Sequence, residues 1–186
     1  EIYNWRVSFN VCYDGQSWLF MLAPCTGIYF DNNTIARYNG FGRSQNACAR
    51  LDVRGGNPVG KPSGAHFRNN LFIYSSSPYS GNRSGGALKT ANWYSKHQSP
   101  DTKYKGDGNQ AGSGDPRLVD LEKQDYRLKA DSPLRGHAIN LSELYKTDFN
   151  GRPLPKTGNW DIGAIQYNAA KETKAMQPER RPTVHR

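Results

Sequence analysis

The sequence repeats one pattern, first as Ile28-Tyr-Phe-Asp-Asn-Asn-Thr-Ile35 and again as His66-Phe-Arg-Asn-Asn-Leu-Phe-Ile73. In both copies, two asparagines stand between short runs of apolar and aromatic residues. Weaker copies are Ile2-Tyr-Asn-Trp-Arg-Val7 and Ala91-Asn-Trp-Tyr94. Short apolar and aromatic runs broken at regular intervals by turn-forming residues are typical of an all-β protein.

The asparagines are suited to corners between strands. Asparagine tolerates a left-handed backbone better than most residues, and its amide can donate to and accept from the asparagine of the next copy. Aligned on Asn4, Asn32, Asn69 and Asn92, the copies are 28, 37 and 23 residues apart. Repeats of this length predict a solenoid in which each coil stacks on the next through parallel strands.

A second apolar run follows each of the first two copies. Trp18–Leu22 and Ala47–Val53 are expected to be second strands of the same coils. The stretches 39–46 and 55–64 are rich in glycine, proline and polar residues, which predicts loops that project from the wall of the solenoid.

The composition is that of a basic, turn-rich protein. Its formal net charge is +9, with 19 glycines and 11 prolines among 186 residues. This charge favours an anionic partner such as an acidic polysaccharide, a nucleic acid or an anionic surface. No RNA-recognition motif, zinc-finger spacing or basic heptad region is present. The net charge is thus the one feature that favours binding of nucleic acid, and nucleic acid is not the expected partner. No run approaches the ~20 apolar residues of a membrane span.

Cysteines and acidic residues give little indication of a cofactor. The cysteines are Cys12, Cys25 and Cys48, and none forms a C-x-x-C pair. They are expected to be small core residues. The alternative is that two of them form one disulfide in an oxidising compartment. No cofactor is predicted. Calcium stays open because aspartates lie near glycine-rich turns, although not at the spacing of an EF-hand; they are Asp107, Asp115 and Asp120.

The second half of the chain carries a series of short motifs. In order, they are Asp115-Pro116, Leu118-Val-Asp120, Tyr126-Arg-Leu128, Ser132-Pro133, Thr147-Asp-Phe-Asn-Gly151 and Asp161-Ile-Gly-Ala164 with Tyr167. This series closely resembles the C-terminal cap of secreted right-handed parallel β-helix proteins. The asparagine repeats resemble the coils of the same proteins, so that the resemblance covers nearly all of residues 1–167.

The resemblance implies an all-β fold made of the last three to four coils of a right-handed parallel β-helix plus a C-terminal cap. Residues 1–98 would form the coils, 99–167 the final loop and a cap that covers the open end, and 168–186 a flexible basic tail. Members are mostly exported proteins, and many are glycoside hydrolases or polysaccharide lyases. The resemblance thus implies a secreted, periplasmic or cell-surface location and a polysaccharide substrate. Such proteins usually have more coils, so an N-terminal portion, separate or missing, is an expected partner.

The alignment on Asn4, Asn32 and Asn69 also predicts a site. Alternate residues of a strand face outward, which would place six side chains in one patch: Glu1, Tyr3, Tyr29, Asp31, His66 and Arg68. Asp31 and His66, together with Asp14 in the following turn, are the candidate catalytic groups. The expected substrate-binding residues are Tyr3, Tyr29, Arg68, Trp18 and Glu1.

Two kinds of bond cleavage are compatible with this patch. Carboxylates serve as acid and base in glycoside hydrolysis, whereas β-elimination needs a base and a cation that neutralises a uronate. The alternative is a non-catalytic β-helix that binds glycan or joins a surface assembly. Polar residues also occur on the exposed strands of any β protein, and a slip of one residue in the register would turn the patch inward.

Overall fold

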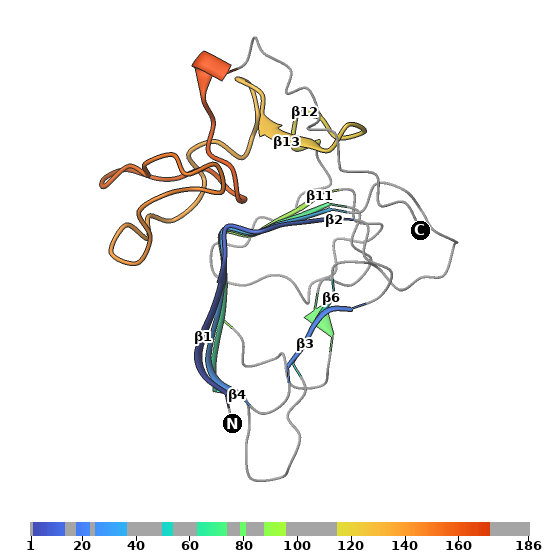
Figure 1. The fold of residues 1–186 in the computed structure, drawn as a ribbon, viewed down its shortest axis with the longest axis vertical. Helices are drawn as coiled ribbons and strands as arrows, with labels where there is room; N and C mark the ends of the chain where they lie inside the picture. Colours follow the sequence, from blue (N-terminus) through green and yellow to red (C-terminus); the bar gives the residue numbers. More distant parts are fainter. Residues whose placement is uncertain are drawn as a thin grey trace, which may run out of the picture.

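The computed structural model describes residues 2–13, 18–22, 25–36, 50–53, 63–73, 79–80, 88–95 and 115–171 (Figure 1). Within these residues the regular structure is β, apart from one 3-10 turn, η3 (Ala169–Lys171). The predicted all-β class is therefore confirmed. None of the described elements is a helix of the length and apolar character needed to cross a bilayer.

The first half of the chain builds three parallel sheets. Their orders are β1-β4-β7-β10, β2-β5-β8-β11 and β3-β6-β9. The strands are β1 (Ile2–Ser8), β2 (Val11–Tyr13), β3 (Trp18–Leu22), β4 (Cys25–Asp31), β5 (Thr34–Ala36), β6 (Arg50–Val53), β7 (Ser63–Arg68), β8 (Leu71–Ile73), β9 (Tyr79–Ser80), β10 (Leu88–Thr90) and β11 (Trp93–Ser95). The chain visits the three sheets in the same order three times and begins a fourth pass with β10 and β11.

Each of the first two passes contains one strand more than the sequence pattern predicts. The predicted runs Trp18–Leu22 and Ala47–Val53 correspond to β3 and β6, which are the third strands of their passes. The three-residue strands β2 and β5 precede them, directly after the corner. These strands are too short for an alternating pattern to distinguish them from the copies of the repeat in which they lie.

A ladder of asparagines runs through the corner between the first two strands of each pass. Asn10 donates its amide to Oδ1 of Asn33 at 3.1 Å, Asn33 to Asn70 at 3.0 Å, and Asn70 to Asn92 at 2.9 Å. The same amide of Asn70 also donates to the carbonyl of Phe30 at 2.8 Å. The predicted amide ladder at the corners is confirmed.

The residue before each ladder asparagine has a left-handed backbone. The φ angles are 53° at Phe9, 53° at Asn32, 60° at Asn69 and 52° at Ala91. Asn32 and Asn69 adopt this conformation at little cost. The first asparagine of each Asn-Asn pair therefore turns the backbone, and the second forms the ladder that reaches all four passes. The first asparagines are also joined to each other, because Asn69 donates its amide to Oδ1 of Asn32 at 3.1 Å.

The alignment of the first copy on Asn4 is wrong. Asn10 is the corner asparagine of the first pass, and the register pairs Ser8 with Asp31 and Arg6 with Tyr29. Asn4 lies inside β1 with a φ of 52°. In the fourth pass, Asn92 aligns with Asn70, the second asparagine of the preceding pair, and not with Asn69.

The interior between the sheets is filled by rows of apolar side chains. Phe30 and Phe67 stack with their ring centroids 5.4 Å apart, and Phe72 and Tyr94 stack at 5.3 Å. Cys12 lies level with Ile35 in this interior and is partly buried. Its thiol is free, and burial raises the pKa of this thiol. The side chains of Cys25 and Cys48 lie outside the described part of the chain.

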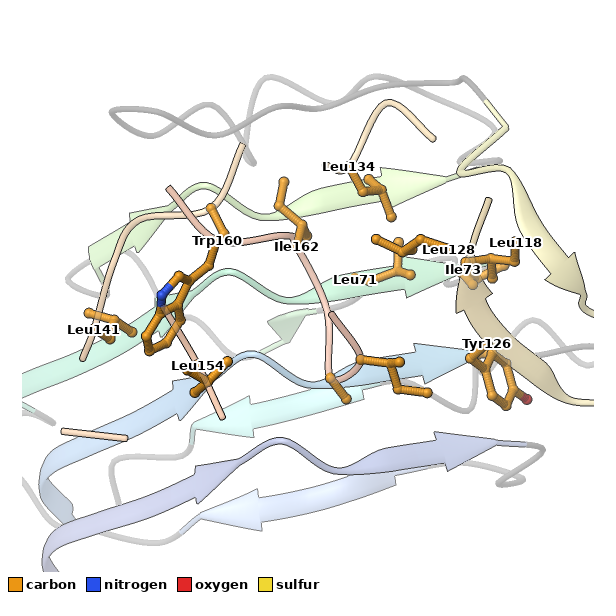
Figure 2. Close-up of a cluster of buried hydrophobic side chains, with 14 residues drawn as sticks. Leu71, Ile73, Leu118, Tyr126, Leu128, Leu134, Leu141, Leu154, Trp160 and Ile162 are labelled. Carbon is orange, nitrogen blue, oxygen red and sulfur yellow. The ribbon is translucent and has the colours of Figure 1, made fainter. Parts of the chain in front are cut away.

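The C-terminal segment, residues 115–171, packs against the outer face of sheet β2-β5-β8-β11 (Figure 1). It begins with the hairpin of β12 (Leu118–Asp120) and β13 (Asp125–Leu128) and continues through turns. Ala36, Leu71 and Ile73 of the sheet share one buried cluster with this segment (Figure 2). The cluster's members from the segment are Leu118, Tyr126, Leu128, Leu134, Ala138, Leu141, Leu154, Trp160, Ile162, Ala164 and Ile165.

Backbone contacts tie this segment to the corner asparagines. Gly163 donates its N–H to the carbonyl of Asn69 at 2.8 Å, and Asn69 exchanges two 2.9 Å hydrogen bonds with the backbone of Ile139. A Cβ at Gly163 would lie 2.8 Å from Oγ1 of Thr34, which explains a glycine there. The expected cap over an open end is thus replaced by a cover along the side of the passes.

Candidate functional site

The candidate site is the outward face of sheet β1-β4-β7-β10. Two rows of side chains cross it: Arg6, Tyr29 and His66 lie at one level, and Ser8, Asp31 and Arg68 at the next. They alternate with Val7, Phe30 and Phe67, which face the interior. The structure therefore brings together four of the predicted residues, namely Tyr29, Asp31, His66 and Arg68.

In the first row, the ring of Tyr29 is covered on both faces. His66 stacks on it with centroids 4.9 Å apart and an interplanar angle of 9°. The guanidinium of Arg6 lies 4.1 Å from the ring centroid. Since Arg6 comes from the preceding pass and His66 from the following one, they occupy opposite faces of the ring. The row presents the edges of these groups to solvent, and Tyr29 has no open face on which a sugar could stack.

In the second row, Asp31 is sealed from solvent. Its side chain is 0% exposed and accepts hydrogen bonds from Nε and Nη2 of Arg68 at 2.7 and 2.6 Å. The hydroxyl of Tyr145, in the C-terminal segment, donates to Oδ2 at 2.6 Å. We define Asp31, Arg68 and Tyr145 as the buried junction. The expected solvent-facing position of Asp31 is wrong, because the C-terminal segment covers this part of the face.

The pKa values follow from this packing. Burial and the carboxylate of Asp31 raise the pKa of Tyr145 to about 12, so its hydroxyl stays protonated and continues to donate. Burial alone would lower the pKa of Arg68, but its hydrogen bonds and charge interaction with Asp31 raise it. Burial, followed by the positive charge of Arg68, lowers the pKa of His66, which is therefore neutral at pH 7.

The strand register does not bring Tyr3 or Trp18 into these two rows. Tyr3 pairs with Thr26 and thus lies several residues from the level of Asp31. Trp18 begins β3 in the third sheet, so its strand is not part of this face. The predictions for Asp14 and Glu1 fall outside the described residues.

Sequence reasoning missed two contributors. Arg6 would have been found by aligning Asn10 with Asn33, because an apolar residue stands three positions before each of them, Val7 and Phe30. Tyr145 had no local indication, since 114 residues separate it from Asp31. Both lie at the site, one over the ring of Tyr29 and the other on the buried carboxylate.

The aspartates considered for calcium make local contacts. Oδ1 of Asp115 accepts the backbone N–H of Arg117 at 2.9 Å, and Asp120 forms an ion pair with Lys123 at 3.0 Å. Asp107 lies outside the described residues. Across those residues, no group of three or more His, Cys, Asp or Glu side chains is arranged to hold a metal ion.

Comparison with models of known protein families and with curated protein sequences finds no match for this chain. The geometry of the outward face is therefore the basis for assigning a function.

Proposed function

We propose that the three passes are coils of a right-handed parallel β-helix, and that the chain is part of an exported carbohydrate-active protein that binds an acidic polysaccharide. The fixed order in which the chain visits three parallel sheets supports the coils. The right-handedness of parallel crossover connections supports the hand. The binding surface in this proposal is the outward face of sheet β1-β4-β7-β10.

The row of Arg6, Tyr29 and His66 is the observation that carries the proposal. Its exposed edges are a guanidinium, a phenol hydroxyl and an imidazole, all of which can donate hydrogen bonds to an anion. Asp31, the one carboxylate among the described residues of this face, is neutralised and covered by Arg68. The face therefore offers positive charge and donors, which suit the carboxylate or sulfate groups of an acidic glycan.

Of the two cleavage reactions, this face favours β-elimination. Hydrolysis uses two available carboxylates that flank the scissile bond, and the burial of Asp31 removes it from such a pair. In β-elimination, neutral His66 takes the proton next to the uronate carboxylate while Arg6 neutralises that carboxylate. The electron pair forms a carbon–carbon double bond, the bond to the leaving sugar oxygen breaks, and water supplies a proton to that oxygen.

The first test is binding. Arg6→Ala is expected to weaken the binding of an acidic oligosaccharide about tenfold or more, because a charge-assisted hydrogen bond is lost. Calorimetry with oligogalacturonate, oligoalginate and chondroitin sulfate oligosaccharides would measure this, and binding should weaken as salt rises. Arg117→Ala is the matched control, because Arg117 is an exposed arginine of the C-terminal segment. An equal loss in both variants, or no binding of any acidic probe, would contradict the proposal.

The second test is cleavage and its dependence on pH. Elimination would release an unsaturated product that absorbs in the near ultraviolet. Because the pKa of His66 is lowered, this base is already deprotonated at mildly acidic pH. We therefore expect kcat/KM to rise with increasing pH, and the midpoint of this rise to lie below pH ~6.5. His66→Ala should reduce the rate about a hundredfold or more.

The readouts separate the alternatives. Reducing ends that appear without ultraviolet absorbance would indicate hydrolysis and remove His66 from the proposed role. Acidic oligosaccharides that bind to Arg6 but are not cleaved would favour the non-catalytic glycan-binding protein. The burial of Asp31 is the observation that favours this second function.

A further inference from the structure

A hollow of about 590 Å³ lies between β2 and the β12–β13 hairpin. Val11 and Tyr13 line it from β2, and Phe149 lines it from a turn of the C-terminal segment. A neighbouring hollow of about 250 Å³ shares Val119, Arg127, Asn150 and Ile165 with it. The volume of the larger hollow falls within the range of small-molecule sites, which are mostly apolar with a few polar groups.

Two exposed aromatic side chains stand at this hollow. Tyr13 is 36% exposed and Phe149 is 52% exposed, the latter an unusual exposure for a phenylalanine. Tyr126, buried at the hairpin side of the apolar cluster (Figure 2), has its ring centroid 6.4 Å from that of Tyr13. The hollow thus combines an apolar aromatic lining with aromatic rings that reach solvent.

The charged groups around the hollow are paired with one another. Asp120 pairs with Lys123 at 3.0 Å, and Oδ1 of Asp125 accepts from Nε of Arg127 at 2.8 Å. Glu122 is the remaining charged residue of the lining. These pairs supply hydrogen-bond donors and acceptors with almost no net charge, in contrast to the basic outward face of sheet β1-β4-β7-β10.

We propose that this hollow binds a neutral sugar of one or two pyranose rings. A pyranose has an apolar C–H face that packs on an aromatic ring and a rim of hydroxyls that both donate and accept. An anionic sugar would meet Glu122 with both basic groups of the lining already paired. A wholly apolar ligand would strip water from the ionised pairs without replacing their hydrogen bonds.

The site differs from the acidic-glycan face in its strands and in its ligand. It is formed by β2, the hairpin and the turn at Phe149, and it shares no residue with the row of Arg6, Tyr29 and His66. A negative result for one of the two proposals therefore does not contradict the other. Together they would give the protein one surface for acidic units and another for neutral units of a glycan.

The test uses the full chain and four neutral disaccharides: cellobiose, maltose, lactose and mannobiose. Ligand-observed saturation-transfer NMR and titration would measure binding at millimolar concentrations. Phe149→Ala is expected to weaken binding of the disaccharide that binds best about tenfold, while Phe149→Tyr keeps the ring and retains binding. Leu144→Ala is the matched control, since Leu144 is 44% exposed and does not line the hollow.

Three results would overturn the proposal: no binding of any of the four disaccharides, unchanged binding in Phe149→Ala, or equal weakening in Leu144→Ala. Because Phe149 is largely exposed, its variants should fold, and an unchanged melting temperature would verify this. Arg6→Ala should leave binding of the neutral sugar unchanged, and Phe149→Ala should leave binding of the acidic oligosaccharide unchanged. A failure at one site is thereby distinguished from a failure at the other.

Discussion

Replacing Asp31 with alanine is expected to lower the free energy of unfolding by about 3–5 kcal/mol, because breaking a buried ion pair leaves its partner charged and unpaired. Asp31 is fully buried and accepts from two nitrogens of Arg68 and from the hydroxyl of Tyr145. Without the carboxylate, both donors keep their burial but lose their acceptor. Denaturant unfolding followed by circular dichroism would measure the change.

The matched control is Asp131→Ala. Asp131 pairs with Arg117 at 2.7 Å, almost the distance found in the buried junction, but the two side chains are 64% and 52% exposed. An exposed pair of this kind contributes under about 1 kcal/mol. If the two alanine variants lost similar amounts of stability, Asp31 would not be sealed, and its solvent-facing role as a catalytic acid would be open again.

Replacing Asn70 with alanine is the second large expected effect, a loss of about 3–4 kcal/mol. Oδ1 of Asn70 accepts from the backbone N–H and the amide of Asn33, both at 3.0 Å. Its amide donates to the carbonyl of Phe30 and to Asn92. All of these groups lie where no water replaces the lost partner, and each buried group left unpaired costs about 1–3 kcal/mol. Denaturant unfolding would measure the loss.

Asn10→Ala tests the same ladder at its exposed end. Asn10 donates to Asn33 in the same way but is open to solvent, so water can satisfy the groups left behind. A loss below about 1 kcal/mol is expected there. A small loss at both positions would mean that the ladder adds little to stability and that the packing of Phe30, Phe67 and Phe72 dominates.

The paired asparagines made much of the first half predictable. They predicted the corners and the levels at which Tyr29 meets His66 and Asp31 meets Arg68, all of which are confirmed. They failed in the first pass because its corner has a single asparagine, Asn10, whereas Asn4 happens to stand between aromatic residues. A left-handed φ at Phe9, a residue without a turn-forming side chain, could not be expected from sequence.

The cover over the second sheet was not predicted, although one indication was present. Leu71-Phe-Ile73 is apolar at every position, and a strand that is apolar on both faces is covered on both faces. What covers it was not deducible, since the turn-rich C-terminal segment carries no periodicity that would assign it to a face. Because the C-terminal segment could not be placed, the contact of Tyr145 with Asp31 could not be predicted either. The burial of Asp31, the candidate catalytic carboxylate, was missed for the same reason.

The hydrogen bonds between the corner residues and the C-terminal segment also bear on the time course of folding. Ala164 donates to Thr34 across 130 residues of sequence, and the amide of Asn69 reaches Ile139 across 70. Contacts of such long range slow the search for the native state. During synthesis, the apolar outer face of β5 and β8 emerges from the ribosome long before the segment that covers it. Until then it is exposed to other chains, so aggregation of the nascent protein is a hazard that residues 115–171 remove once they cover this face.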